Sequence, residues 1–231
     1  WGGELLCVDG AAFTRLGQLE SIALPGGDKA AKEPWRMAAA ALYRLGRGEE
    51  IASRFSSQSA AQHLRQILQR QLNCPATSSL GRWFDAAAAL LGVREVIAYE
   101  GQAAMLLEGL AEQHGEVEPM RDGFTLRHDG RLDLLPVLAR LADEPDAARG
   151  AALFHATLAQ GLAEWTQQAA RAQGLMTVAL GGGCFLNHVL TRKLTHLLVE
   201  SHLTVLSAQR MPPNDGGLSL GQAWIAAQAK G

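Results

Sequence analysis

Residues 178–187 read Val-Ala-Leu-Gly-Gly-Gly-Cys-Phe-Leu-Asn, and this stretch decides the fold. An apolar run followed by three glycines and a further apolar segment is typical of a buried strand, a tight turn and a helix. Because glycine has no Cβ, a flat or charged ligand can approach the backbone of Gly181, Gly182 and Gly183, and the N–H groups of the following helix point toward it. The stretch therefore predicts a nucleotide-holding loop, with Asn187 at the start of the helix.

A second turn contains Asp215, which lies 28 positions beyond Asn187. Residues 212–217 read Pro-Pro-Asn-Asp-Gly-Gly, and they place the Asn214 amide and the Asp215 carboxylate directly before a helical run at 218–229. Carboxylates are common ligands of divalent metals, so Asp215 is a candidate metal ligand and Asn214 a candidate contact to the nucleotide. We predict that the two loops converge from two strand ends on one bound nucleotide, which requires Asn187 and Asp215 to open onto one shared cleft.

The last third of the chain alternates helices and strands, which predicts an α/β layer whose strand ends lead into ligand loops. The expected elements are helix 146–173 with Gly174 at its stop, strand 176–180, helix 187–200, strand 203–206 and helix 218–229.

The preceding part of the chain reads as a strand pair followed mainly by helices. Residues 1–24 predict two strands joined near Asp9 and Gly10. The side chains expected to be buried there are Leu5, Leu6, Val8, Phe13, Leu16 and Ile22. Further predictions are a helix N-capped by Asp28 that ends near residue 45, a helix over 51–72, and a helix over 86–91 capped by Ser78 or Ser79. They continue with a strand at 96–98, a helix reaching about residue 113, a small hairpin within 115–133 and a helix ending before Pro145.

Composition narrows the class of protein. The chain has 231 residues, is 48% hydrophobic and carries a net charge of −2, so it can bury a sizeable core. It has no basic run with interleaved aromatic residues, which argues against sustained binding to nucleic acid. No apolar run reaches the length of a membrane span. Its cysteines, Cys7, Cys74 and Cys184, are odd in number and widely spaced, which favours a reducing cytoplasm over a disulfide framework or a zinc site.

Two carboxylates stand at predicted helix starts. Arg82 and Asp85 are three positions apart, on one face, and Asp85 can accept hydrogen bonds from ribose hydroxyls or simply complement the helix dipole. Glu100 precedes Gly101 and has the same two interpretations, because that glycine lets a ligand approach. His155, on the predicted long helix, is interpreted as a hydrogen-bonded interface histidine, with a site role as the alternative.

Six motifs in order resemble the C-terminal part of the hydrogenase-maturation carbamoyltransferase family, HypF. They lie at residues 1–4, 24–28, 78–86, 99–104, 182–187 and 212–223, so the resemblance runs from one end of the chain to the other. It implies an α/β, actin-like (sugar-kinase/Hsp70-like) ATPase fold with a substantial helical portion, related to the enzymes that build threonylcarbamoyl adenosine on tRNA. The chain is then a carbamoyltransferase domain lacking its N-terminal lobe, with a strand pair and helical nucleotide-facing portion at 1–145 and an α/β portion at 146–231.

The resemblance also implies a function. A family member makes carbamoyl adenylate from carbamoyl phosphate and ATP, and passes the carbamoyl group to the C-terminal cysteine of a partner protein, HypE, for the cyanide ligand of [NiFe]-hydrogenase. Asp85, Glu100 and Gly101 become candidates for the ribose end. Gly181, Gly182, Gly183 and Asn187 become candidates for adenine and its sugar. Asp215 becomes a ligand of a divalent metal (Zn, Fe or Mg).

The sequence departs from the family pattern in three respects. Gly181 stands where the family usually has Ser, and His188 stands where Arg is common. The family's metal-binding histidine pair precedes the motif at residues 1–4 and is not in this sequence, and one carboxylate alone does not hold a metal with useful affinity. We therefore expect the chain to be a fragment with an incomplete metal site. Cys184 is expected to pack rather than react, because the accepting thiolate belongs to the partner.

Two other functions are compatible with a nucleotide loop. The first is an actin-like sugar or acyl kinase, but Asp9 and Gly10 lack the strand and signature of a phosphate turn. The second is a nucleotide-sensing or scaffold module without turnover, which an incomplete metal site permits.

Overall fold

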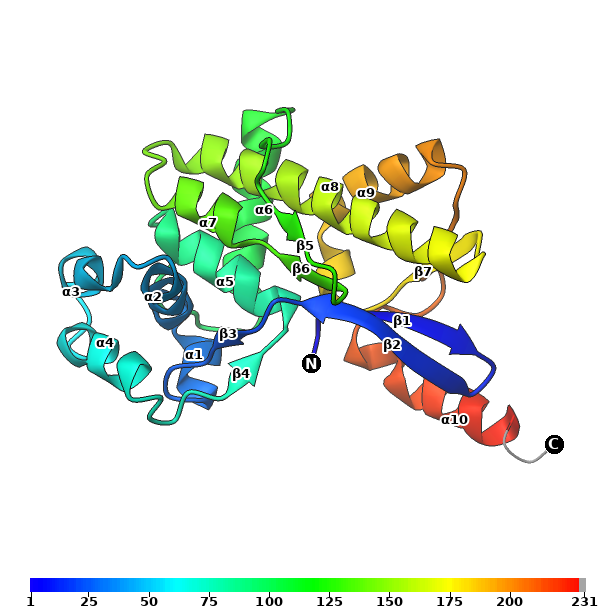
Figure 1. Ribbon diagram of the computed structural model, residues 1–231, viewed down its shortest axis with the longest axis horizontal. Coiled ribbons are helices and arrows are strands. Elements are labelled where there is room, and N and C mark those ends of the chain that lie inside the picture. Colours follow the sequence, from blue (N-terminus) through cyan, green and yellow to red (C-terminus); the bar gives the residue numbers. More distant parts are fainter. Residues whose placement is uncertain (229–231) are drawn as a thin grey trace.

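The computed structural model describes residues 1–228, with helices forming most of the body and a long hairpin extending from it (Figure 1). The strands are β1 (Glu4–Asp9), β2 (Ala12–Leu19), β3 (Ile22–Ala23), β4 (Ala76–Thr77), β5 (Thr125–Leu126), β6 (Arg131–Asp133), β7 (Thr177–Leu180) and β8 (Thr204–Ser207). The helices are α1 (Asp28–Lys32), α2 (Pro34–Arg44), α3 (Ile51–Arg54), α4 (Ala61–Gln69), α5 (Leu80–Leu90), α6 (Gln102–His114), α7 (Leu135–Leu141), α8 (Ala147–Gln173), α9 (His188–Glu200) and α10 (Leu218–Gln228). The short 3-10 helices are η1 (Gly48–Glu50), η2 (Gly183–Leu186) and η3 (Asp215–Gly217).

Three small sheets organise the strands. The largest has the order β1-β2-β6-β5, in which β1 and β2 are antiparallel and β2 runs parallel to β6. Strands β3 and β4 form an antiparallel pair. Strands β7 and β8 are parallel, with Val178 opposite Val205, and both lead into the loops predicted to bind a nucleotide.

Helix α8 is the longest element, and its ends follow from its sequence. The Asp146 side chain accepts hydrogen bonds from the backbone N–H groups of Ala148 and Arg149, which caps the N-terminus. Gly174 ends the helix in a left-handed conformation with φ of 65°, which glycine adopts at little cost. The predicted helix 146–173 is therefore confirmed.

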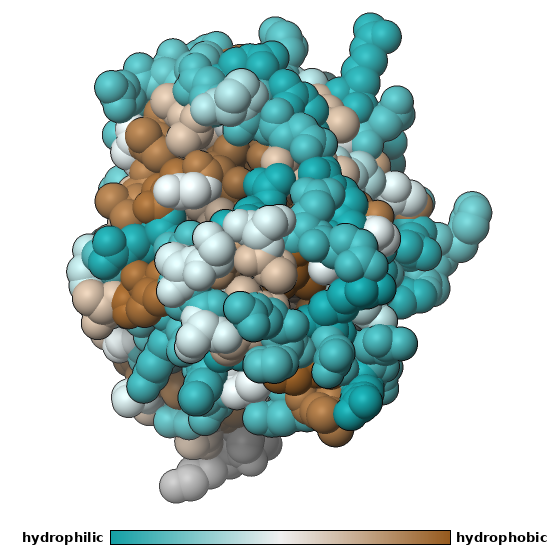
Figure 2. Space-filling view, turned by 90° about the vertical axis from the view of Figure 1, so that its left-hand side faces the viewer, coloured by the Kyte–Doolittle hydropathy of each residue, from teal (hydrophilic) through white to brown (hydrophobic). Residues whose placement is uncertain are grey.

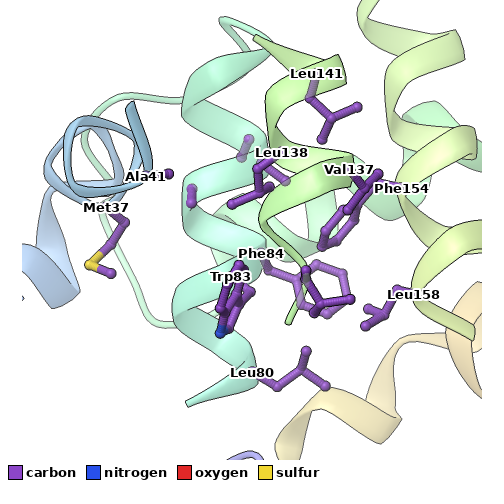
Figure 3. Packing of buried hydrophobic residues seen from close by; sticks show 14 of the residues in the cluster. Met37, Ala41, Leu80, Trp83, Phe84, Val137, Leu138, Leu141, Phe154 and Leu158 are labelled. Carbon is purple, nitrogen blue, oxygen red and sulfur yellow. The ribbon is translucent and has the colours of Figure 1, made fainter. Parts of the chain in front are cut away.

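The core lies between the helices, with α5 at its centre. Helix α5 packs against α2, α6, α7 and α8, and α8 packs against α6 and α9. Trp83 and Phe84 of α5 are fully buried, and Figure 3 shows Phe84 pointing from α5 toward Phe154 of α8. This core holds α5, with Asp85 at its middle, in a fixed position relative to α8.

The α3–α4 side of the molecule is mostly polar at its surface (Figure 2). Helix α4 buries Ala61, Leu64 and Leu68 along one stripe and leaves its polar residues exposed. That arrangement is typical of a surface helix with one face on the core.

Several predicted elements in the first two-thirds of the chain were wrong in detail. Asp28 is the first residue of α1 rather than its cap, because Gly27 takes the N-cap position. The helix then stops before Pro34, since proline lacks the N–H that a continuous helix needs. The predicted helix 51–72 is split into α3 and α4 by turns at residues 55–60, where three serines favour non-helical backbone.

The strand predicted at residues 96–98 does not form. This segment bonds instead to the end of α1 and the start of α2. The N–H of Ile97 donates to the carbonyl of Lys32, and the backbone N–H of Trp35 donates to the carbonyl of Glu95. Helix α5 also begins earlier than predicted, and Ser79 is its N-cap without a side-chain hydrogen bond.

The predicted hairpin at the start of the chain is confirmed, but the expected burial of three of its side chains is wrong. Leu6, Val8 and Phe13 are 43%, 65% and 60% exposed, whereas Ile22 is buried as expected. Val8 lies opposite Phe13, and Leu6 is two residues from Val8, so the three side chains share one face of the hairpin. Residues 1–228 do not cover that face.

The remaining predicted elements agree with the structure. The hairpin within 115–133 forms as β5 and β6, and the helices expected after it and before it form as α7 and α6. Strands β7 and β8 and helices α9 and α10 lie within one or two residues of their predicted bounds, and position 229 lies outside the described residues.

Candidate functional site

The glycine loop and the Pro-Asn-Asp-Gly-Gly loop come together at the ends of β7 and β8. The N–H of Gly182 donates to the carbonyl of Pro213 at 2.7 Å, which joins the two loops directly. A Cβ placed on Gly183 would lie 3.7 Å from the Cβ of Asn214. Because β7 and β8 are parallel neighbours, their carboxyl ends meet at one edge, where ligands bind in α/β layers.

A cavity of about 480 Å³ lies between these loops. It is lined by Gly182, Ala208, Gln209, Met211, Pro212, Pro213, Asn214, Asp215, Gly217 and Leu218. Its volume is in the range of small-molecule sites. Gly182 is the one residue of the glycine loop in this lining, and it shares the cleft with Asn214 and Asp215. Asn187, which was expected to open onto the same cleft, does not line it.

The conformation of Gly182 is specific to glycine. Its φ is +113°, whereas Gly181 has an ordinary φ, and a Cβ added at Gly181 would meet no atom within 4 Å. A side chain at Gly182 would strain the backbone that bonds to Pro213.

We therefore expect Gly182→Ala to destabilise the protein by about 1–3 kcal/mol and to weaken any ligand bound in the cavity. The matched variant Gly181→Ala should change stability by less than about 0.5 kcal/mol. Urea unfolding of both variants measures this difference, and equal stability of the two would contradict the strained geometry at Gly182.

Asn187 lies beneath the glycine loop rather than in the cavity lining. It is 6% exposed, and its Oδ1 accepts from the N–H of Leu190 at 2.9 Å, which caps α9. Its Nδ2 lies 3.0 Å from Nε2 of His155. Both ends of the amide are thus engaged within the protein.

Asp85 and Arg82 form a buried ion pair on α5. Because α5 begins at Leu80, Asp85 lies in the middle of the helix, and the expectation that it stands at a helix start is wrong. Arg82 Nη1 and Asp85 Oδ2 are 2.8 Å apart, but neither atom has an aligned hydrogen-bond partner among the described residues. Burial raises the pKa of the Asp85 carboxyl to about 6, and the charge of Arg82 acts in the opposite direction. Asp85 therefore keeps unused hydrogen-bonding capacity, but a ligand reaches it only if neighbouring side chains move.

Cys184 directly follows the three glycines, as the second residue of η2. Burial raises the pKa of its thiol to about 11, and the charges of Arg82 and Asp85 also act on it. A thiol with such a high pKa is a poor nucleophile at neutral pH. Cys184 packs against the core, as expected.

Glu100 and Gly101 lie at the start of α6, outside the cavity lining. Glu100 is exposed, and Gly101 is the N-cap of α6 with φ of +78°. Helix α6 contacts the start of α9, because Glu108 accepts a hydrogen bond from the N–H of His188 at 2.6 Å. His188 thus begins α9 with its backbone held by a carboxylate.

Asp215 supplies only part of what a metal needs. It is exposed in the first turn of η3. Within residues 1–228, no three His, Cys, Asp or Glu side chains gather into a group that could hold a metal ion. The residues present therefore do not fit a complete metal site, and any metal bound at Asp215 takes its other ligands from elsewhere.

Two contributors to this region were missed in the sequence. His155 was expected to be a hydrogen-bonded histidine, which is confirmed, but its partner Asn187 was not identified. The carbonyl of Pro213 was also missed, because backbone acceptors leave no signal in residue identity. The three consecutive glycines at 181–183 were the one sign in the sequence that another stretch of backbone approaches closely.

Comparison with known proteins gives the family. Residues 1–222 match the family model described as "Carbamoyltransferase, Kae1-like Domain, second subdomain". The chain is 53% identical to Carbamoyltransferase HypF2 of Cupriavidus necator, covering 99% of this chain and 32% of that protein. It is 49% identical to a HypF homolog of the same organism, covering 99% of this chain and 61% of that protein. With Carbamoyltransferase HypF of Rhizobium leguminosarum it shares 43% identity over 99% of this chain and 30% of that protein.

Solved structures agree. Full-length HypF in a phosphate- and nucleotide-bound form superposes with a TM-score of 0.86 at 32% identity, covering 99% of this chain and 31% of that one. HypF of T. kodakarensis gives a TM-score of 0.84 at 27% identity, covering 99% and 32%. These matches confirm the expected actin-like ATPase type of fold, and they show that the chain spans about a third of the length of most of these relatives. The chain belongs to the HypF carbamoyltransferase family, within its Kae1-like domain.

Proposed function

We propose that this chain forms the nucleotide-holding part of a carbamoyltransferase that acts in [NiFe]-hydrogenase maturation. The observation that supports this most directly is the shared cavity of Gly182, Asn214 and Asp215 at the ends of two parallel strands. In the proposal, residues 146–231 supply the loops that face the nucleotide, and residues 1–145 supply Asp85 and Glu100 at its ribose end. ATP and carbamoyl phosphate are the proposed substrates, and carbamoyl adenylate is the species held in the cavity.

The proposed reaction is acyl transfer to sulfur. The thiolate of a C-terminal cysteine on the partner, HypE, attacks the carbamoyl carbon. A C–S bond forms, the bond between that carbon and the phosphate oxygen breaks, and AMP leaves with the electron pair. The thiol proton passes to solvent before the attack. In the proposal the attacking thiolate is the partner's, whereas Cys184, whose thiol pKa burial raises to about 11, is a packing residue.

The chain's own contribution is binding and orientation. Backbone N–H groups at the loop and the short 3-10 helices can face the phosphate, where negative charge is favoured. Asn214 uses Oδ1 to accept from the N–H of Gly216 at 3.0 Å, which leaves its Nδ2 for a ligand. Asp215 is proposed as one ligand of a divalent metal, whose role when bound is to neutralise phosphate charge.

One experiment separates this function from its alternatives. ATP and AMP are titrated calorimetrically, and carbamoyl transfer to a peptide with the partner's C-terminal cysteine is assayed with and without the upstream region of a family member. Binding with transfer only when the upstream region is present supports the proposal. Binding without transfer in either case favours a sensor or scaffold, and phosphorylation of a small sugar favours a kinase.

The role of Asp85 is tested in the same titration. Asp85→Asn should weaken AMP binding by about tenfold at pH 7.5, because a hydrogen bond to an ionised carboxylate contributes roughly 1.5–3 kcal/mol. The control is Asp129→Asn, which removes an exposed carboxylate paired with Arg131 in the β5–β6 turn. Equal AMP affinity in the two variants would leave Asp85 with only its ion pair to Arg82.

The structure gives one further observation on placement. Among residues 1–228, no helix combines the length and apolar character needed to cross a bilayer.

A further inference from the structure

His155 is fully buried on α8, and both of its ring nitrogens are used. Its ring packs edge-on against Phe84 and Phe154, with centroids 5.5 and 5.9 Å away. Nδ1 lies 2.8 Å from the carbonyl oxygen of Ala151, and Nε2 lies 3.0 Å from Nδ2 of Asn187. A carbonyl oxygen only accepts, so Nδ1 carries the proton and Nε2 accepts from Asn187.

This tautomer fixes the orientation of the Asn187 amide. Because Nε2 of His155 accepts, the NH₂ group of Asn187 must face the ring and its Oδ1 must face away. Oδ1 is then placed to accept from the N–H of Leu190, which caps α9. With the amide turned the other way, a lone pair would face Nε2 and a donor would face the N–H of Leu190. His155 therefore selects the orientation in which α9 is capped.

The bonds continue from Asn187 to both loops of the cavity. The N–H of Asn187 donates to the carbonyl of Cys184, and the N–H of Phe185 donates to the carbonyl of Gly182. The N–H of Gly182 in turn donates to the carbonyl of Pro213. A continuous series of hydrogen bonds thus runs from the core of α8 to the loops that line the cavity.

We propose that His155 is a positioning residue that sets the conformation of the glycine loop through Asn187, and so determines how well the loop holds its nucleotide. The effect on nucleotide binding rests on the proposed function, whereas the effect on the conformation of the loop does not. His155 lies behind the loop, so it acts on the ligand only through the backbone that Asn187 holds.

The test compares three variants by hydrogen exchange and ATP titration. His155→Leu removes the acceptor and keeps an apolar side chain of similar bulk. His155→Gln can still accept from Asn187. Thr157→Val is the matched control on the same helix: Thr157 is also fully buried, and its hydroxyl accepts from the N–H of Met120, away from the loop.

We expect the amide protons of Leu190 and Gly182 to exchange roughly tenfold faster in His155→Leu, as for the loss of one buried hydrogen bond, and ATP to bind about tenfold more weakly. His155→Gln should restore most of both properties. Thr157→Val should lower overall stability without a selective change at Leu190 or Gly182. Equal changes in His155→Leu and Thr157→Val would overturn the proposal, since a purely structural role predicts them.

The outcomes also separate this proposal from the proposed function. If the wild-type protein binds no ATP but the exchange pattern is as expected, the function is wrong and the positioning of the loop stands. If ATP binds equally to wild type and His155→Leu, and exchange is unchanged, the positioning role is wrong and the function stands.

If His155→Leu does not fold, His155→Asn replaces it. Asn is one methylene shorter than Gln, so its side chain should fail to reach Asn187, and the amide proton of Leu190 should exchange faster in His155→Asn than in His155→Gln. Equal exchange in this pair would overturn the proposal.

Discussion

Phe84→Ala is expected to lower the free energy of unfolding by about 3–5 kcal/mol, the usual cost of removing a buried phenylalanine side chain. Phe84 is fully buried and lies edge-to-face with Phe154, at a centroid distance of 5.1 Å. Its ring joins α5 to α8, and Figure 3 shows no other labelled side chain between these two rings. Truncation therefore leaves a cavity at the contact between the helix of Asp85 and the helix of His155.

The measurement is equilibrium unfolding in urea, with Phe13→Ala as the control for residue type. Phe13 is 60% exposed on the β1–β2 hairpin, so its truncation should change stability by less than about 0.5 kcal/mol. A loss below about 1 kcal/mol for Phe84→Ala would show that the α5–α8 contact collapses around the vacancy or is not part of the core.

The last third of the fold could be predicted from sequence because its signals are local. Asp146 and Gly174 mark the two ends of α8 by cap chemistry, and the glycines at 181–183 mark the turn after β7. Each of these residue types fits a backbone conformation that few others adopt. The meeting of the two loops followed from the topology, because parallel neighbouring strands bring their carboxyl ends to one edge.

The first two-thirds could not be predicted as well, because tertiary contacts decide the outcome there. Alternation in the first hairpin indicated buried side chains, but alternation reports which residues share a face and not whether that face is covered. The strand expected at 96–98 does not form for a related reason: the N–H of Ile97 donates to the carbonyl of Lys32, at the end of a helix, and not to a neighbouring strand. Short apolar runs do not reveal their bonding partners.

In the candidate site, too, local signals were predictable from the sequence and tertiary contacts were not. Gly182, Asn214 and Asp215 were brought to one cavity, as their loops predicted. The contacts to Asn187 were not predictable, because His155 is 32 positions away along the chain and only packing of α8 against α9 brings the two together. Assignment of Asp85, Glu100 and Gly101 to the ribose end stays a prediction.

Stability is expected to fall as pH is lowered from about 6.5 to about 4, by about 3 kcal/mol through His155 alone. Burial lowers the pKa of this histidine from 6.5 to about 4 in the folded chain, more strongly than its hydrogen bond to Ala151 raises it. Between these two pH values the unfolded chain binds a proton that the folded chain excludes, so acid favours unfolding. From about one pH unit above 6.5 both states are neutral at this residue, and its contribution no longer changes with pH.

Other groups titrate in the same range, so the comparison must isolate His155. Asp85 acts in the opposite direction, because its pKa is raised from 3.8 to about 6 and the folded chain binds its proton first. The free energy of unfolding is therefore measured in urea at several pH values for wild type and for His155→Gln, whose side chain does not titrate. Contributions common to both proteins cancel in the difference, and the variant should gain about 3 kcal/mol relative to wild type between pH 7 and pH 4. A difference that stays constant with pH would show that His155 is protonated as readily in the folded chain as in the unfolded one, which is incompatible with a ring whose Nε2 accepts the Asn187 amide. The burial of the His155 ring between α5 and α8 is thus the cause of the expected sensitivity to acid.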